Sequence, residues 1–99
     1  MTTSAFLILA DSLLAALEEG IGPDAELQAG ILTVEADEGT WIVNKHGPSQ
    51  QVWVSSPKSG ARHYAYSHER KAWLDTRGGG ELLASLSEEL GVPLTWAVP

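Results

Sequence analysis

The chain has 99 residues, a length that suits one domain with a single hydrophobic core. It contains no cysteine, which excludes disulfide bonds and any metal site held by the chain's own thiolates. The formal net charge is −7, and no apolar run approaches the length of a membrane span.

The negative charge is concentrated in the first half of the chain. No Lys or Arg occurs through Asn44, whereas this half carries eight acidic residues; from Lys45 onward there are six basic and five acidic residues. An acidic half repels phosphates and therefore argues against non-specific nucleic-acid binding. It suits a basic protein surface or hard cations that accept carboxylate oxygens, and the alternative is that these acids only keep the protein soluble.

The first segment predicts an amphipathic helix that is capped by Thr3 or Ser4 and runs to about Glu19. Gly20 and Gly22-Pro23 are expected to end it. The predicted apolar stripe consists of Phe6, Leu9, Ala10, Leu13, Leu14 and Leu17. Leu7 and Ile8 fall outside this stripe, so either the C-terminal tail covers them or they lie exposed.

The middle of the chain predicts a series of short strands. A strand over 24–29 is followed by a turn at Gly30, a strand over 31–36 and a hairpin turn at Asp37-Glu38-Gly39. Alternating residues predict strands over 40–45 and 50–56, separated by Gly47-Pro48-Ser49. Further strands are expected over 61–67 and 71–75.

The last part of the chain predicts a second helix over about 80–90, after the break at 78–80. Its inward residues are predicted to be Leu82, Leu83, Leu86 and Leu90. Gly91 and Pro93 end this helix, and the tail over 94–98 is expected to pack against the helices. Trp41, Trp73 and Trp96 are interpreted as residues of the core or of its edge.

This order of elements predicts an α+β fold. Loops of hairpin length require antiparallel pairing, and two amphipathic helices need one apolar sheet face to cover. The expected architecture is a two-layer sandwich, with two helices packed on one face of an antiparallel sheet of five to six strands. Residues 1–99 are expected to form a single domain.

Trp53 stands out in the strand over 50–56. Period-two geometry places it with Gln51 and Ser55, opposite Val52 and Val54, on the side that should meet water. One interpretation is a tryptophan half-covered by a loop, since single exposed apolar residues are common. The other is a rigid aromatic anchor for a partner, flanked by the amides of Asn44 and Gln51.

The three histidines do not indicate a catalytic site. His46, His63 and His68 have no plausible triad or metal-ligand spacing in the sequence. His68 lies in a charged stretch and is interpreted as a solvated loop residue. If Tyr64 and Tyr66 point into the core, His63 emerges on the same sheet face as Asn44 and Trp53.

Several stretches of the sequence resemble the frataxin family, including its bacterial members. The strongest similarity is Asn44-Lys45, then Gln51-Val52-Trp53-Val54-Ser55-Ser56-Pro57 and Ser59-Gly60. It extends to Ala10-Asp11, to Gly30-Ile31-Leu32-Thr33-Val34, to Trp73 and to the helix from Leu82-Leu83 to Glu88-Glu89-Leu90. The resemblance therefore covers nearly the whole chain in order, and it implies the same two-layer fold as the residue pattern.

The resemblance implies a docking surface on the open sheet face. Frataxins use this face to contact the cysteine desulfurase and scaffold protein of iron–sulfur cluster assembly. By resemblance, Asn44, Gln51 and Trp53 are the expected contact residues. His63 stands where the family usually has an arginine, and whether Arg62 compensates from the next position is left open.

The resemblance also implies weak binding of iron, as Fe²⁺ or Fe³⁺, along an acidic ridge. The matching carboxylates are Asp11, Glu18, Glu19, Asp24 and Glu26. The ridge is thin, because the stretch over 6–10 is uncharged. Scattered carboxylates on a convex surface offer few ligands per ion, so the binding should be weak and dependent on ionic strength.

The expected function is therefore that of a frataxin, a monomer that binds iron weakly and regulates sulfur transfer on the desulfurase–scaffold complex. One alternative is oxidation of ferrous iron by a ferroxidase-type activity, although no paired Glu-x-x-His motif of di-iron proteins occurs. A third interpretation is an acidic interaction module without an iron role. The expected partners include neither nucleic acid nor membrane.

The start of the chain has neither a signal-peptide n-region nor an arginine-rich transit segment, which predicts a cytoplasmic location; a mature organellar form would lie in the mitochondrial matrix.

Overall fold

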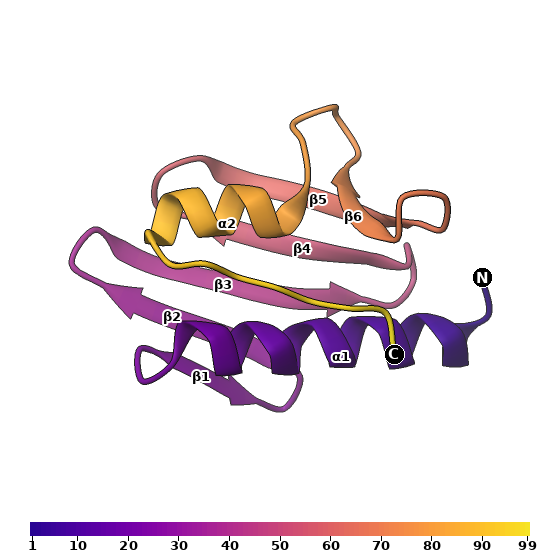
Figure 1. Ribbon diagram of the computed structural model, residues 1–99, viewed down its shortest axis with the longest axis horizontal. Coiled ribbons are helices and arrows are strands. Elements are labelled where there is room, and N and C mark those ends of the chain that lie inside the picture. Colours follow the sequence, from indigo (N-terminus) through magenta and orange to yellow (C-terminus); the bar gives the residue numbers. More distant parts are fainter.

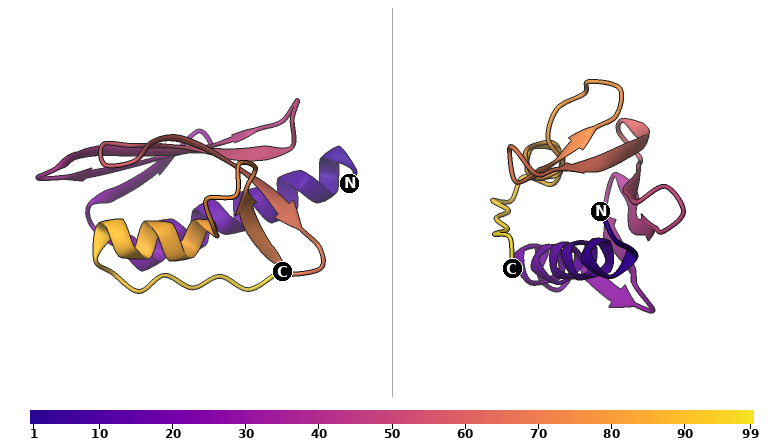
Figure 2. Two further views of the ribbon diagram at one scale, coloured as in Figure 1. Left: turned by 90° about the horizontal axis from the view of Figure 1, so that it is seen from above. Right: turned by 90° about the vertical axis from the view of Figure 1, so that its right-hand side faces the viewer.

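A six-stranded antiparallel sheet forms one layer of the fold, and two helices cover one of its faces (Figures 1 and 2). The computed structural model describes all residues, Met1–Pro99. The strands lie side by side in chain order. The elements are α1 (Thr3–Ile21), β1 (Ala25–Gln28), β2 (Ile31–Ala36), β3 (Gly39–His46), β4 (Gln51–Ser56), β5 (Gly60–Ser67), β6 (Ala72–Asp75) and α2 (Leu82–Leu90). This arrangement confirms the predicted fold class. Neither helix combines the length and apolar character needed to cross a membrane.

Helix α1 begins and ends slightly outside its predicted bounds. Thr2 is the N-cap, and its Oγ1 accepts a hydrogen bond from the backbone N–H of Ala5 at 3.0 Å. The helix continues through Gly20 to Ile21, so the predicted cap and end were wrong by one or two residues. Gly20 remains helical where the tail packs closely over it: a Cβ there would lie 2.9 Å from Cδ2 of Leu94. A tertiary contact therefore favours glycine at this position.

The first two hairpins have two-residue turns. The β1–β2 turn consists of Ala29 and Gly30, which both have positive φ (53° and 77°), as this tight turn requires. The predicted strand over 24–29 is therefore shortened to β1. Gly39, after the β2–β3 turn, has φ of 137°, and a Cβ there would lie 2.7 Å from Cβ of Pro57. Only glycine meets both conditions, which explains its place beside the turn.

The β3–β4 connection differs from the prediction by one residue. The turn spans 47–50, because Gln50 has φ of 53° and donates its backbone N–H to the carbonyl of Gly47 at 3.0 Å. Strand β4 therefore begins at Gln51. The predicted inward side of this hairpin is confirmed, since Val43, Val52 and Val54 are all buried.

The core lies between the sheet and the helices. The six residues of the predicted α1 stripe are all buried, and Trp41 and Trp73 are fully buried in the sheet. On α2, Leu82 and Leu86 are buried, whereas Leu83 and Leu90 are partly buried against the same core. Ala36 lies on the expected strand face but is exposed.

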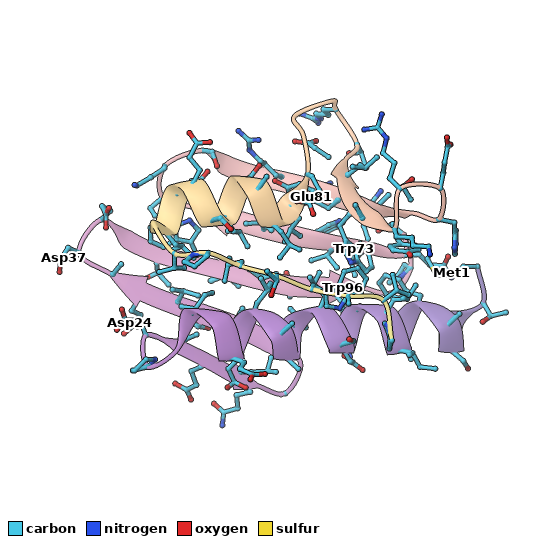
Figure 3. The ribbon with its side chains drawn as sticks, viewed as in Figure 1. Met1, Asp24, Asp37, Trp73, Glu81 and Trp96 are labelled. Carbon is cyan, nitrogen blue, oxygen red and sulfur yellow. The ribbon has the colours of Figure 1, made fainter.

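The C-terminal tail packs between the two helices, as predicted (Figure 1). Leu94 is buried, and the indole N–H of Trp96 donates to Oγ of Ser12 on α1 at 3.0 Å. The rings of Trp73 and Trp96 lie next to each other, 6.2 Å apart between centroids (Figure 3). Leu7 and Ile8 stay outside this contact, and Ile8 is 62 % exposed.

Candidate docking face and acidic edge

The sheet face turned away from the helices, here called the outer face, is left open by the fold (Figure 2). Strand register places one row of residues across it: Ile31 beside Asn44, Asn44 beside Trp53, and Trp53 beside His63. A neighbouring row contains Ile42 and Ser55. Ile31 and Ile42 are 45 % and 41 % exposed. The outer face therefore presents apolar side chains next to amides and hydroxyls.

The middle of the outer face carries no permanently charged side chain. The outward residues of β3, β4 and β5 include no Lys, Arg, Asp or Glu; they are Thr40, Ile42, Asn44, His46, Gln51, Trp53, Ser55, Ala61, His63, Ala65 and Ser67. In a chain of net charge −7, such a surface stands out. Depletion of charge around a central aromatic residue is typical of the core of a protein–protein interface.

Trp53 lies at the centre of a three-ring stack. The ring of His46 covers one side of the indole at a centroid distance of 3.8 Å and an interplanar angle of 11°. The ring of His63 stacks on the indole at 4.3 Å and 10°. Two near-parallel contacts restrict the rotamer of Trp53, so the three rings form a preformed ridge on the outer face.

Hydrogen bonds tie this stack to the strands and turn beside it. The indole N–H of Trp53 donates to Oε1 of Gln51 at 2.8 Å. Nδ1 of His46 lies 2.7 Å from Oγ of Ser49 in the β3–β4 turn, which orients the imidazole over the indole. Since its N–H already has an acceptor, Trp53 presents mainly the apolar edge of its ring at the surface.

The structure brings together four of the five residues expected at the docking surface. Asn44, Gln51, Trp53 and His63 share the outer face. Arg62 does not: it pairs with Val54 in the register and therefore points to the helix side, where its Nη1 lies 3.7 Å from Oδ2 of Asp75. The question left open by the sequence is thus answered: Arg62 does not take the place of an outer-face arginine, because adjacent strand residues point to opposite faces.

Sequence reasoning missed the role of His46. It lies diagonally from Trp53 across the β3–β4 hairpin, and that neighbour relation depends on a turn of four residues rather than three. Alternation alone could have placed His46 on the same face as Asn44. His68 is exposed in the β5–β6 turn, where its ring meets the edge of Tyr66, and takes no part in the stack.

Two of the five expected iron ligands already have partners within the fold. Asp11 forms an ion pair with Lys45 of β3, and Oε2 of Glu18 accepts the backbone N–H of Leu27 at 3.1 Å. Both contacts join α1 to the sheet. Glu19, Asp24 and Glu26 are exposed. The predicted ridge therefore divides into two structural carboxylates and three that face solvent.

The exposed acids continue into an acidic edge, defined as Asp24, Glu26, Glu35, Asp37 and Glu38. Asp24, Glu26 and Glu35 line one hollow, and Asp24 lines a second hollow with Glu35, Asp37 and Glu38. Asp24 and Asp37 lie at the end of the molecule opposite Met1 (Figure 3). No three His, Asp or Glu side chains come close enough to hold a metal ion as a preformed cluster. The acidic edge is a region of negative potential rather than a coordination site.

Two carboxylates outside the predicted set are held by specific partners. A hydrogen bond from its own backbone, together with the Lys58 ammonium at 3.2 Å, holds the pKa of the exposed Glu38 below its ordinary value. Partial burial by itself would raise the pKa of Glu89, but hydrogen bonds from Ser56, Trp41 and Ser59 outweigh it and lower the pKa. Glu89 thus joins α2 to β3 and to the β4–β5 turn.

Two helices on one face of an open six-stranded antiparallel sheet are the arrangement of a frataxin-like fold. The frataxin-like domain family matches residues 1–95. The chain is similar to a frataxin from Psychromonas ingrahamii, with a TM-score of 0.76 and 29 % identity over 98 % of this chain and 99 % of that one. It is also similar to a trimeric frataxin from Saccharomyces cerevisiae, complexed with ferrous iron by its description, with a TM-score of 0.69 and 33 % identity over 88 % and 82 % of the two chains.

Relatives in sequence agree with this assignment. The chain is 36 % identical to the iron-sulfur cluster assembly protein CyaY of Delftia acidovorans, over 98 % of both chains. It is 42 % identical to the mitochondrial frataxin homologue of Schizosaccharomyces pombe over 83 % of this chain. It spans about half the length of that homologue (54 %) and of a mitochondrial frataxin-like protein of Leishmania donovani (48 %). The chain belongs to the frataxin family.

Proposed function

We propose that this protein takes part in iron–sulfur cluster assembly and regulates sulfur transfer by docking on a cysteine desulfurase–scaffold complex. The observation that carries this proposal is the outer face, where a locked Trp53 lies in a surface without permanent charge. Membership of the family, and the name of the Delftia relative as an assembly protein, support the choice of partner. Asn44 and Gln51 supply polar groups beside the aromatic centre.

The preorganised side chain of Trp53 favours binding at the outer face. Interface affinity is concentrated in a few aromatic or arginine residues near the centre of the contact, surrounded by groups that exclude water. Trp53 lies in the middle of the outer face. The rings stacked on it restrict its side chain, which reduces the conformational entropy lost on binding. Ile31 and Ile42 extend the apolar area on one side of it.

The test is the affinity of the Trp53→Ala variant for the desulfurase–scaffold complex, measured by titration. The loss should be about 2 kcal/mol or more, the threshold of an interface hot spot, which corresponds to roughly thirtyfold. Ile8→Ala is the matched control, because Ile8 is more exposed but lies on the helix layer. A folded Trp53→Ala protein that binds as tightly as the unchanged protein would end the proposal.

We also infer that iron binds weakly at the acidic edge and the adjoining Glu19. Three exposed carboxylates of the expected set remain available there, and Glu35 and Asp37 add to the negative potential, whereas Glu38 is paired with Lys58. Oxygen ligands suit ferrous and ferric ions. Because no cluster of three ligands is preformed, ion binding depends on long-range attraction and on ligands supplied by water.

Paramagnetic broadening by ferrous iron should therefore begin at Glu19, Asp24 and Glu26 and reach Asp11 and Glu18 later. The carboxylates of Asp11 and Glu18 are already engaged by Lys45 and the Leu27 backbone. Asp24→Asn combined with Glu26→Gln should shift the first broadening away from this edge, whereas Glu69→Gln in the β5–β6 turn should leave it unchanged. Broadening centred on His46, His63 and His68 would disprove this placement.

A further inference from the structure

A small pocket opens where strand β5 extends past the end of β6. It has a volume of about 120 Å³ and is lined by Ala61, Arg62, His63, Asp75, Thr76 and Arg77. Sites for drug-sized molecules occupy roughly 300–1,000 Å³, so this pocket fits the head group of one side chain instead. Five of its six lining residues are polar or charged, and two of these are arginines, in a chain with few of them.

The one carboxylate in the lining is already engaged. Oδ1 of Asp75 accepts the backbone N–H of Arg77 at 2.8 Å, and Oδ2 lies 3.7 Å from Nη1 of Arg62. Arg62 also donates to the carbonyl of Gly79 at 3.4 Å. Gly79 approaches this pair so closely that a Cβ would lie 2.3 Å from Oδ2 of Asp75. The β6–α2 loop therefore packs against the Arg62–Asp75 pair and nearly buries the Asp75 carboxylate, whereas the Arg62 side chain stays partly exposed.

Three donors of the lining remain unused. The guanidinium of Arg77 makes no ion pair and no hydrogen bond, and neither does the hydroxyl of Thr76 or the imidazole of His63. Two arginines against one aspartate give the pocket a formal charge of +1, before any contribution from His63. This is opposite in sign to the net charge of −7 of the whole chain.

The pocket adjoins the outer face through His63. That residue stacks on Trp53 with its ring and also lines the pocket. Its backbone carbonyl accepts the N–H of Thr76 at 2.9 Å, which fixes the start of the β6–α2 loop beside the stack. A protein that covers Trp53 therefore comes within reach of Arg77. The acidic edge lies on β1 and β2, at the opposite side of the sheet.

We propose that this pocket receives the side-chain carboxylate of an Asp or Glu of the protein that docks on the outer face. Arg77 donates to it through its guanidinium, which suits the two oxygens of a carboxylate, and Thr76 and His63 complete the contact. A carboxylate fits better than a phosphate, because Asp75 in the lining repels a dianion more strongly than a monoanion. The proposal rests on the function proposed above, and it adds the chemistry and the orientation of the partner: an acidic residue beside an apolar surface, placed over the β5 side.

The experiment compares two charge reversals in binding to the desulfurase–scaffold complex. Arg77→Glu should weaken binding by about tenfold or more, because it sets two carboxylates against each other. Arg70→Glu makes the same change of charge in the exposed β5–β6 turn, away from the pocket, and should change the affinity by less than about threefold, as expected of a screened surface charge. Arg77→Lys should fall between Arg77→Glu and the unchanged protein, since it keeps the charge and loses the planar donor pair.

The acidic residue of the partner is identified by reversing the charge of its acidic side chains one at a time. Single Asp→Lys and Glu→Lys changes on the partner are tested against Arg77→Glu, and one of them should restore binding to that variant while it weakens binding to the unchanged protein. The pocket proposal would be overturned if Arg77→Glu and Arg70→Glu weakened binding equally, or if no change on the partner restored binding to Arg77→Glu. In that case, weak binding of the complex by Trp53→Ala would still support the docking face. Normal binding by Trp53→Ala, or no binding by the unchanged protein, would overturn the proposed function and this inference with it.

Discussion

The two faces of the sheet use the same strands and the same residue type for different purposes. On the helix-covered face, Trp41 and Trp73 are fully buried among leucines and valines. On the outer face, Trp53 is half-buried between two imidazoles. The indole N–H of Trp41 donates to Glu89 and that of Trp53 to Gln51, whereas the buried indole N–H of Trp73 has no acceptor. What distinguishes these tryptophans is the layer that covers them: helices cover the face with Trp41 and Trp73, whereas no element of the chain covers the outer face.

The largest effect should come from Trp41→Ala on the covered face. Removal of a fully buried indole creates a cavity and leaves Glu89 without one of its donors, so the loss of unfolding free energy should be about 3–5 kcal/mol. Urea denaturation followed by circular dichroism measures it. A loss below that of Trp53→Ala would contradict the contrast between the two faces.

The next effect concerns Trp96, which closes the gap between the helices. Trp96→Ala should destabilise the fold by about 1–4 kcal/mol, because the ring packs on Trp73 and Tyr66 but is only partly buried. Trp96→Phe keeps a ring and loses the hydrogen bond to Ser12, so it should cost only about 1 kcal/mol. An unchanged denaturation midpoint for Trp96→Ala would show that the tail is not docked.

A smaller loss of stability is expected for Trp53→Ala. Alternation alone predicts a change of no more than about 1 kcal/mol. The two stacked histidines raise the expected loss of unfolding free energy to about 1–2 kcal/mol, because each aromatic contact adds to stability. Denaturation of the double variant His46→Ala/His63→Ala provides the control, since it removes the stack and keeps the indole. A loss as large as that of Trp41→Ala would place Trp53 in the core.

The smallest effect is the contribution of Glu89 to acid stability. Because its pKa is lowered in the folded protein, its stabilising contribution is present above the pKa of the unfolded chain and is lost as the pH falls through the folded pKa. The stability difference between the unchanged protein and Glu89→Gln should therefore shrink on acidification. Denaturation midpoints measured across the acidic range test this, with Glu88→Gln on the exposed side of α2 as control. A difference that stays constant with pH would contradict it.

Much of the fold could be predicted from local patterns. The apolar stripe of α1 is buried as expected, and the six predicted strands occur with bounds that differ by at most one residue. It was also predictable that Val52 and Val54 lie on one side of the sheet and Trp53 on the other, because strand side chains alternate strictly. The remaining errors at Thr2, Gly20 and Gln50 lie at element ends, where capping, tail packing and turn geometry decide the boundary.

The candidate site was harder to predict from local sequence patterns. Arg62 was grouped with His63 by its place in the chain, although neighbours on a strand point to opposite faces. The ion pair of Asp11 with Lys45 and the contact of Glu18 with the Leu27 backbone join residues that are far apart in sequence. No local pattern could have shown that these carboxylates hold the helix to the sheet.

The sequence by itself determined the class of each element and the face of each strand residue, because both follow from periods of a few residues along one chain. Only the tertiary structure decided which outward side chains touch. The stack of His46, Trp53 and His63 requires the register of three strands, and the pocket at Arg77 requires the β6–α2 loop to pack on the Arg62–Asp75 pair. These relations depend on turn lengths and on packing across the whole sheet, which is why they became visible only in three dimensions.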